Sequence, residues 1–309
     1  ELRYGENPHQ KAFLYKNGNP FFIKLHGKEL SYNNICDIES AFHIVNEFKK
    51  QNKFAASIIK HSNPCGVALA ENGLNAYKKA LSSDPVSAFG GIVSLNTKVN
   101  LKIANEIIKT FTEVILAPNF SDKALHLLKS KKNLRVVKNR KNYDHIKNEK
   151  ICKSLIDGFL IQDKNELTQE DLNFDNFKVV TKKKPSKKEI QDLFFAFETV
   201  KHVKSNAIVI AKEETTLGIG AGQMSRIDSV LIAKRKTISF SERNKTNLNN
   251  MVLASDAFFP FSDSILEVSN FGVTSIIQPG GSVRDKEIIQ AANDAGISMI
   301  FTGKRHFLH

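Results

Sequence analysis

Residues 55–66 read Ala-Ala-Ser-Ile-Ile-Lys-His-Ser-Asn-Pro-Cys-Gly. The run 55–60 predicts a short buried strand, so the polar segment after it lies at the carboxyl end of that strand. Ligands of open α/β sheets bind at the carboxyl ends of strands. Lys60 can stabilise an oxyanion, and His61 can exchange protons near neutral pH. The pattern alone fits equally well a Ser-Asn-Pro turn with a solvated lysine.

Apolar periodicity along the rest of the chain predicts alternating strands and helices, which indicates an α/β fold. Buried strands are expected at 55–60, 91–95, 207–211, 251–255, 273–278 and 297–302. Helices with an apolar stripe are expected at 38–50, 100–116, 189–204 and 285–295.

The length of 309 residues is typical of two domains, and we expect a boundary between about 165 and 188. The predicted units are 1–175 and 176–309. Short polar words recur in both units. Lys-His-Ser-Asn at 60–63 is echoed by Lys-Ser-Asn at 204–206, and a Ser-Asp pair precedes an aromatic loop in each unit. The echo fits a duplicated unit, and it fits equally the chance recurrence of short polar motifs.

The net charge of +13 is concentrated in two segments. Residues 129–153 hold ten basic and two acidic side chains, and residues 182–188 hold five basic side chains and no acidic one. Sites that stack nucleic-acid bases interleave aromatic side chains with the cations. Because Tyr143 is the only aromatic residue of either segment, we expect solvated surfaces and no nucleic-acid partner.

The three cysteines are Cys36, Cys65 and Cys152, an odd number without Cys-x-x-Cys spacing, which is typical of a reducing compartment. No apolar run reaches the roughly 18–20 residues of a membrane-spanning helix. We therefore expect a cytoplasmic protein without a membrane partner. Zinc is not expected either, because Asn63 and Ala68 stand where the zinc deaminase signature needs Glu and Cys.

Three more segments carry groups suited to a ligand. The glycine-rich residues 218–226 allow close backbone approach and end at Arg226, although a Gln breaks the dinucleotide fingerprint. Residues 255–263 place three Phe around a Pro and end at Asp263, which suits a planar heterocycle or, alternatively, a helix N-cap. Residues 278–282, Gln-Pro-Gly-Gly-Ser, precede a predicted helix as anion sites often do.

Six segments in this order resemble one known family: 2–10 (Leu-Arg-Tyr-Gly-Glu-Asn-Pro-His-Gln), 60–66, 89–91, 218–226, 255–263 and 305–309 (Arg-His-Phe-Leu-His). Over essentially the whole chain they closely resemble the formyltransferase domain of the bifunctional AICAR transformylase/IMP cyclohydrolase family. AICAR is 5-aminoimidazole-4-carboxamide ribonucleotide. The resemblance implies two cytidine-deaminase-like α/β/α subdomains without zinc.

The implied activity is transfer of a formyl group from 10-formyltetrahydrofolate, the co-substrate, to the 5-amino group of AICAR in purine (IMP) biosynthesis. The alternative is a domain that binds nucleotides or nucleic acid without catalysis. A purified chain that consumes AICAR only with the folate would separate the two.

The resemblance also implies roles for single residues. His61 would be the base or proton shuttle, Lys60 would supply positive charge beside it, and Asn206 would orient the reactants or stabilise the oxyanion. Nucleotide contacts are expected from Arg3, Tyr4, Lys60, Phe89, Gly90, Arg226, Phe258, Arg305 and His309, with the basic members near the phosphate. Folate contacts are expected from Ile227, Pro260, Asp263 and Ser282, and Phe307 is a further substrate-binding residue.

The family resemblance further implies a homodimer with active sites between subunits, in which Arg3 and Tyr4 reach the partner's site. It allows a structural monovalent cation. The family's IMP cyclohydrolase domain lies before the Leu-Arg-Tyr-Gly motif, so we expect this chain to be the transformylase part only.

Overall fold

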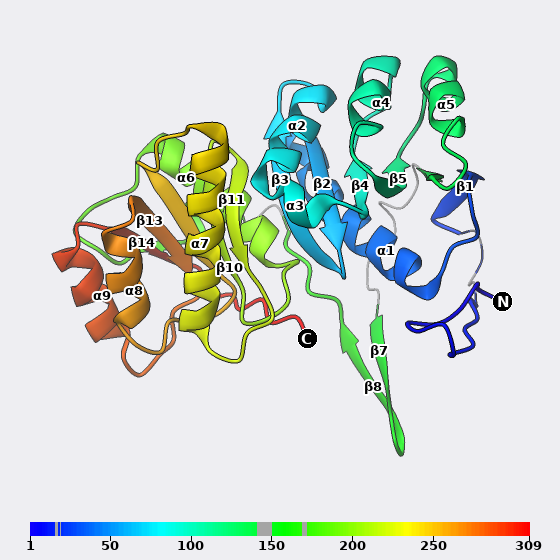
Figure 1. The fold of residues 1–309 in the computed structure, drawn as a ribbon. Helices are drawn as coiled ribbons and strands as arrows, with labels where there is room; N and C mark the ends of the chain where they lie inside the picture. Colours follow the sequence, from blue (N-terminus) through cyan, green and yellow to red (C-terminus); the bar gives the residue numbers. More distant parts are fainter. Residues whose placement is uncertain (16–17, 19, 141–149, 169–171) are drawn as a thin grey trace.

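The computed structural model describes residues 1–309 except 16–17, 19, 141–149 and 169–171 (Figure 1). Twelve strands form one sheet in the order β1-β6-β5-β4-β2-β3-β11-β10-β12-β13-β14-β9. Two more strands, β7 (Lys150–Leu155) and β8 (Gly158–Asp163), form a separate hairpin that projects from the body. The predicted α/β fold is confirmed.

The first half of the large sheet is built by residues up to 139. Its elements are β1 (Phe22–His26), α1 (Tyr32–Glu47), the 3-10 turn η1 (Phe48–Gln51), β2 (Phe54–Lys60), β3 (Asn63–Ala70), α2 (Gly73–Ser83), α3 (Pro85–Ala88), β4 (Gly91–Leu95), α4 (Leu101–Ile107), β5 (Thr112–Ala117), α5 (Asp122–Lys129) and β6 (Arg135–Asn139).

The second half begins after the hairpin. Its elements are η3 (Phe174–Asn176), β9 (Lys178–Val179), α6 (Lys187–Val200), β10 (Ile208–Lys212), β11 (Thr215–Gly220), α7 (Arg226–Asn244), β12 (Met251–Ser255), α8 (Asp263–Ser269), β13 (Val273–Gln278), α9 (Asp285–Asp294) and β14 (Ser298–Phe301).

The two halves repeat the same arrangement. In each half, a hairpin (β2–β3, β10–β11) is followed by three parallel strands (β4–β5–β6, β12–β13–β14). The last parallel strand of each half pairs with an antiparallel edge strand, β1 with β6 and β9 with β14. The helix before each hairpin begins with a serine capping box, at Ser31 for α1 and at Ser186 for α6. Such repetition is what a duplicated unit leaves, while the domain boundary between 165 and 188 stays a prediction.

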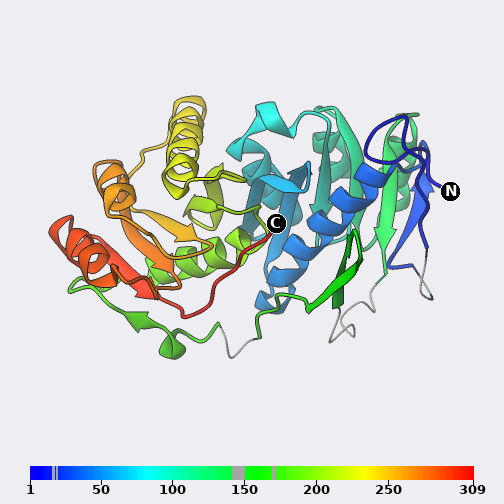
Figure 2. The same cartoon turned by 90° about the horizontal axis from the view of Figure 1, so that it is seen from below.

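Helices cover both faces of the sheet (Figure 2). On one face, α1 and α6 lie against a single apolar core to which both halves contribute, with Ile38 and Phe48 from the first half and Phe195 and Phe197 from the second. On the other face, α2, α4 and α5 cover one core and α7, α8 and α9 cover another. The shared core therefore fixes the two halves relative to each other.

The predicted strands are confirmed to within one residue at each end. The helix predicted at 100–116 is wrong in its second part, because α4 ends at Ile107 and 112–117 form the strand β5. The β-branched run around Val114 and Ile115 packs better on a sheet than on a helix. The helix predicted at 38–50 begins earlier, at Tyr32, because Ser31 caps it.

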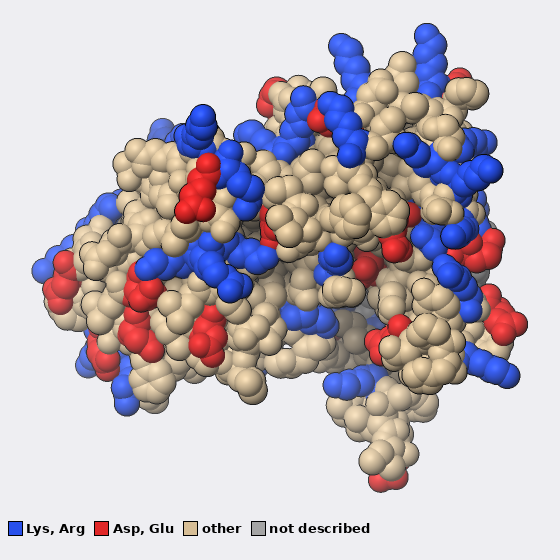
Figure 3. Space-filling view, viewed as in Figure 1, with Lys and Arg blue, Asp and Glu red and all other residues tan. Residues whose placement is uncertain are grey.

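Charged side chains are unevenly spread over the surface (Figure 3). Lys and Arg side chains stand out over α4 and α5, whereas Asp and Glu gather over α8 and α9. Lys182, Lys183 and Lys184 of the second basic segment are exposed, while 141–149 of the first lie outside the described residues. Across the described residues, every helix falls short of the length and hydropathy that a membrane crossing requires.

A buried polar network links α1 to α6 beneath the shared core. Glu47 Oε1 contacts Lys201 Nζ at 2.5 Å and His202 Nε2 at 3.1 Å. Burial would raise the pKa of Glu47, but His202 and Lys201 outweigh it and lower that pKa to about 2. Glu198, only 1% exposed, accepts a hydrogen bond from Gln51 Nε2 at 2.8 Å. Burial and the nearby Glu47 raise the pKa of Glu198 to about 8.

The raised pKa of Glu198 makes a prediction for stability against pH. The protonated, neutral Glu198 contributes its full stabilisation of the fold below pH 4.5, the usual pKa of a glutamate carboxyl. That contribution is lost as the pH rises toward the folded-state pKa of about 8. Glu198→Gln keeps a neutral side chain at every pH. We expect wild-type stability to fall relative to E198Q between about pH 5 and 8, by at most about 1.4 kcal/mol per pH unit, in urea unfolding.

The exposed Glu242 supplies the control, because E242Q removes a carboxylate outside the network. The lowered pKa values of His202 and His306 act in all three proteins and cancel in the comparison. Parallel curves of stability against pH for wild type and E198Q would contradict the prediction.

Candidate active site

The segment 60–63 forms the tight turn of a β-hairpin. Strand β2 ends at Lys60, β3 begins at Asn63, and the two residues between them have positive φ, His61 at +53° and Ser62 at +58°. The turn does lie at the carboxyl end of its strand. Because β2 runs antiparallel to β4, however, it lies at the amino end of the parallel strands β4–β5–β6. The strand directions place the carboxyl ends of β12–β13–β14 at this same edge.

Asn63 joins this turn to the segment 204–206 of the second half. Its Nδ2 donates to the carbonyl oxygen of His61 at 3.1 Å, and its Oδ1 accepts from the backbone N–H of Lys204 at 3.0 Å. The side-chain amide of Asn63 thus contacts the backbone of both polar motifs, 60–63 and 204–206. The structure brings His61 and Asn206 to the same edge through this bridge.

Asn206 is held by several hydrogen bonds. Its Nδ2 donates to the carbonyl oxygens of Gln223 and Met224, both at 3.0 Å, and its Oδ1 accepts from Arg226 at 2.7 Å. Both N–H groups of the amide are therefore used within the chain. Its Oδ1 keeps a second lone pair.

Arg226 is 6% exposed and is paired within the chain. Its guanidinium donates to Asp256 Oδ1 at 2.5 Å and to Ser255 Oγ at 2.8 Å, besides Asn206. Asp256 is fully buried, so this ion pair is removed from solvent. Arg226 thus orients Asn206 and carries a neutralised charge, a role that the sequence did not predict.

A cavity of about 490 Å³ opens beside Asn206. Eight predicted site residues line it: Asn206, Arg226, Ile227, Phe258, Pro260, Asp263, Arg305 and Phe307. They come from the loop before β10, the start of α7, the loop between β12 and α8 with the first residue of α8, and the C-terminal tail. Asp263 is the first residue of α8, whose N-cap position is Ser262, so the N-cap alternative for Asp263 is wrong. The cavity combines aromatic walls with a carboxylate and a cation.

Lys60, Phe89 and Gly90 lie together on the first half. Lys60 Nζ donates to the carbonyl oxygen of Phe89 at 2.8 Å, and the ring of Phe89 contacts the ring of Phe111 with centroids 5.2 Å apart. Gly90 has φ +75°, a conformation that favours glycine, and donates to the carbonyl oxygen of Phe111 at 2.8 Å. Phe89 is 59% exposed, so its ring can still contact a ligand.

The C-terminal tail is held at the same edge of the sheet. Lys204 Nζ donates to the carbonyl oxygen of His309 at 2.8 Å, and Leu308 exchanges hydrogen bonds with Ser205. The guanidinium of Arg305 lies 4.4 Å from the ring centroid of Phe307. The tail is thereby placed next to Asn206.

Besides the turn, the Phe89–Gly90 segment and His309, three more predicted residues lie outside the lining of this cavity: Ser282, Arg3 and Tyr4. Ser282 lies in the loop before α9, where its N–H donates to Asp285 Oδ1 at 3.1 Å. Arg3 stacks over the ring of Tyr4, and the carbonyl oxygen of Tyr4 accepts from Tyr32 at the start of α1. Arg3 and Tyr4 therefore lie on the first half, where Figure 1 shows the N-terminus, whereas the residues that line the cavity all belong to the second half.

Cys65 is not a reactive nucleophile in this structure. Burial, followed by the nearby Asp84, raises the pKa of its thiol to about 12. The thiolate, which is the reactive form, is therefore scarce at neutral pH. Within the part of the chain that the structure describes, no three His, Cys, Asp or Glu side chains form a group that could hold a metal ion.

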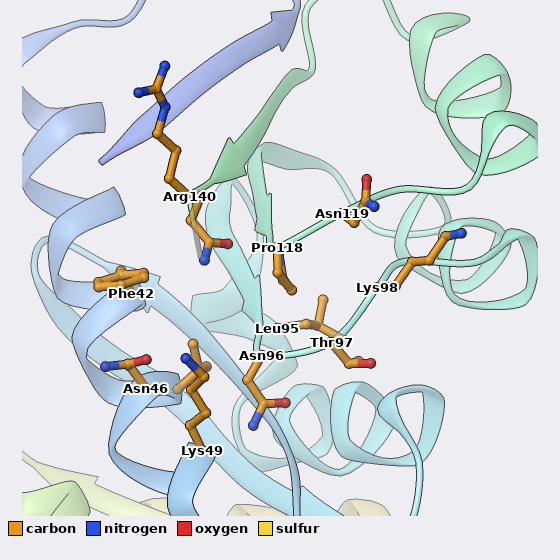
Figure 4. Close-up of a pocket in the computed structure, with 12 residues that line it drawn as sticks. Phe42, Asn46, Lys49, Leu95, Asn96, Thr97, Lys98, Pro118, Asn119 and Arg140 are labelled. Carbon is orange, nitrogen blue, oxygen red and sulfur yellow. The ribbon is translucent and has the colours of Figure 1, made fainter. Parts of the chain in front are cut away.

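A larger cavity, of about 670 Å³, lies at the opposite edge, beyond the carboxyl ends of β4, β5 and β6 (Figure 4). Lys49 and Asn46 reach toward it, while Lys98 and Arg140 extend outward from its rim. Among the residues that the structure describes, its lining holds apolar side chains, amides and these cations, with no carboxylate and no histidine. The described part of this lining therefore offers no general base that would work near neutral pH.

Some residues of the site were not foreseen. Met224, Ser225, Ala257, Phe261 and Ser264 complete the lining of the 490 Å³ cavity, and most of them lie inside motifs already singled out. Asp37 was missed altogether, although it binds the turn that carries His61. One sequence signal points to it: Ser31 and Asp37 have the same spacing as Ser186 and Asp192.

Comparison with known proteins agrees with this picture. Residues 1–236 match the family model described as AICARFT/IMPCHase bienzyme. The chain belongs to the AICARFT/IMPCHase bienzyme family. The predicted family resemblance is thereby confirmed.

Individual relatives are similar over the whole chain. The bifunctional purine biosynthesis protein PurH of Bartonella henselae is 50% identical, and that of Caldicellulosiruptor saccharolyticus is 52% identical. PurH of Mesorhizobium japonicum is 48% identical. Each alignment covers 100% of this chain but only 58–59% of the relative, so the chain spans about three fifths of the length of these family members.

Proposed function

We propose that this chain is the formyltransferase of its family and transfers the formyl group of 10-formyltetrahydrofolate to the 5-amino group of AICAR. The observation that carries the proposal is the bridge that Asn63 makes between the turn carrying His61 and the segment 204–206, whose Asn206 lines an aromatic-walled cavity. Membership of the family supports it.

The reaction needs a base at the amine. The amino nitrogen attacks the formyl carbon and forms the new C–N bond, and His61 takes a proton from it as the attack proceeds. That amine is a weak nucleophile, because its lone pair delocalises into the imidazole ring. Asn206 Oδ1 can accept a second hydrogen bond, from the amine, which would aim the lone pair at the formyl carbon.

Lys60 carries the stabilisation of the tetrahedral oxyanion in this proposal. Both N–H groups of the Asn206 amide are already used, whereas the ammonium of Lys60 donates to Phe89 and has two further protons. The intermediate then collapses: the bond between carbon and N10 of the folate breaks, and N10 takes up a proton as tetrahydrofolate leaves. His61, protonated in the first step, is a suitable donor for it.

The cavity suits the folate. Phe258 and Pro260 offer flat apolar surface to a pterin ring, and the Asp263 carboxylate can accept its N–H groups. Arg305, at the same cavity, is a candidate for the nucleotide phosphate, because Arg226 is already paired with Asp256. Ser282, His309 and the structural monovalent cation stay predictions from the family resemblance.

Replacing the proposed base tests this function. We expect His61→Ala to fold normally and to lower kcat by about 10²- to 10⁴-fold, because the substitution removes the imidazole that is proposed to take the proton. The measurement is folate-dependent consumption of AICAR by the purified chain. His126→Ala, which removes an exposed histidine on α5, serves as control. Undiminished turnover by a natively folded H61A protein would remove His61 from the mechanism.

We also propose that the active form is a homodimer. The β7–β8 hairpin stands off the body with apolar side chains exposed, including Ile156, Phe159 and Ile161 at 102%, 68% and 66%. A lone two-stranded hairpin of this kind has little stability in water, so a second copy is a suitable cover for it. Arg3 and Tyr4, placed away from their own chain's cavity, are free to serve the partner's.

Mixing two inactive variants tests the shared site. If Arg3 serves the partner's site, a dimer of one R3A chain and one H61A chain has one site with both defects and one with none. Co-expressed R3A and H61A chains should then recover up to about a quarter of wild-type activity, while each alone stays low. A mixture that stays as inactive as its parts would place Arg3 in its own chain's site or outside catalysis.

A further inference from the structure

Asp37 holds the turn that carries His61. It lies on α1, and its Oδ1 accepts from the backbone N–H of Ser62 at 2.7 Å and from the Ser62 hydroxyl at 3.3 Å. The backbone N–H of His61 also donates to this carboxylate. The backbone of both turn residues is in the left-handed region, which residues other than glycine rarely adopt. The carboxylate binds the N–H groups that this conformation turns toward α1.

The second half of the chain contains the same arrangement. Asp192 on α6 accepts from the backbone N–H groups of Glu213 and Glu214, at 3.0 and 2.8 Å. These two residues form the turn between β10 and β11, and both have φ +52°. Asp192 follows its N-cap Ser186 by the same interval as Asp37 follows Ser31. The aspartate clamp is thus a repeated part of the fold.

The two clamps differ in what their turns carry. In the second half, the turn residues are acids with ion-pair partners, Glu213 with Lys188 and Glu214 with Lys53. In the first half, the turn presents an exposed imidazole, and Asn63 adds a bond to the His61 carbonyl oxygen. One clamp therefore holds a proton-transfer group and the other holds surface ion pairs.

We propose that Asp37 is a positioning residue that fixes His61 for proton transfer. The proposal rests on the proposed function. Without the carboxylate, the turn loses the acceptor for its N–H groups and relaxes toward conformations that suit His and Ser better. Because the imidazole stands on this backbone, a shift of about 1 Å in the turn lowers the rate strongly.

The matched pair of clamps gives a sharp test. In the purified chain, we expect Asp37→Ala to lower kcat at least about tenfold, with the KM for AICAR changed less than about threefold. Asp192→Ala removes the equivalent clamp and should lower the unfolding midpoint similarly while leaving kcat within about twofold. Asp37→Asn keeps one acceptor oxygen and should restore most of the lost kcat.

The outcomes separate cleanly. Equal kcat losses in D37A and D192A would show a general structural effect and overturn the positioning role, as would an unchanged kcat in D37A. If D37A does not fold, the comparison of Asp37→Ser with Asp192→Ser replaces it, with the same expected split. If the wild-type chain and the H61A chain are both unable to consume AICAR with the folate, the proposed function itself is contradicted.

Discussion

The strand pair β3–β11 joins the two halves of the sheet. The position of the site residues of one half relative to those of the other depends on the register of β11 against β3. The hydroxyl of the fully buried Thr216 satisfies both backbone groups of Val67 on β3. It accepts from the Val67 N–H at 2.9 Å and donates to the Val67 carbonyl oxygen at 3.2 Å. Ser83 Oγ donates to the Thr216 carbonyl oxygen at 2.5 Å. Sliding β11 would leave these buried groups without partners, which is costly. The register is thereby fixed, and with it the meeting of 60–63 with 204–206.

Repetition of one unit with its strands reversed gives the sheet two similar edges. At each edge, a clamped hairpin turn of one half faces the carboxyl ends of the parallel strands of the other. One edge carries His61 and Asn206 beside the aromatic-walled cavity. The other carries the Glu213–Glu214 turn, and the described residues that line its larger cavity offer cations and amides, with no carboxylate or histidine among them. Architecture alone does not distinguish the edges, so side-chain chemistry decides which edge suits the proposed formyl transfer.

Most of the strands and of the candidate site could be predicted from the sequence. Buried strands are recognisable as short apolar runs, and the site motifs lie at the ends of these runs. Local patterns did not reveal β3, because 63–70 begins with Asn-Pro-Cys-Gly and resembles a loop. They could not assign Arg226 either, since its pairing with Asp256 joins residues 30 positions apart through the tertiary fold. Asp37 was missed for the same reason. A single aspartate on a helix can be assigned a role only once the tertiary fold places the hairpin turn against it.

A crystal structure of the chain with AICAR and a non-transferable analogue of 10-formyltetrahydrofolate tests the central claim most directly. The account predicts that the 5-amino group lies within hydrogen-bond distance, about 3 Å, of both His61 and Asn206 of one chain. The pterin should lie between Phe258 and Pro260 with its N–H groups toward Asp263. AICAR bound in the cavity beside Lys49 and Asn96, or an amine out of reach of His61, would contradict it.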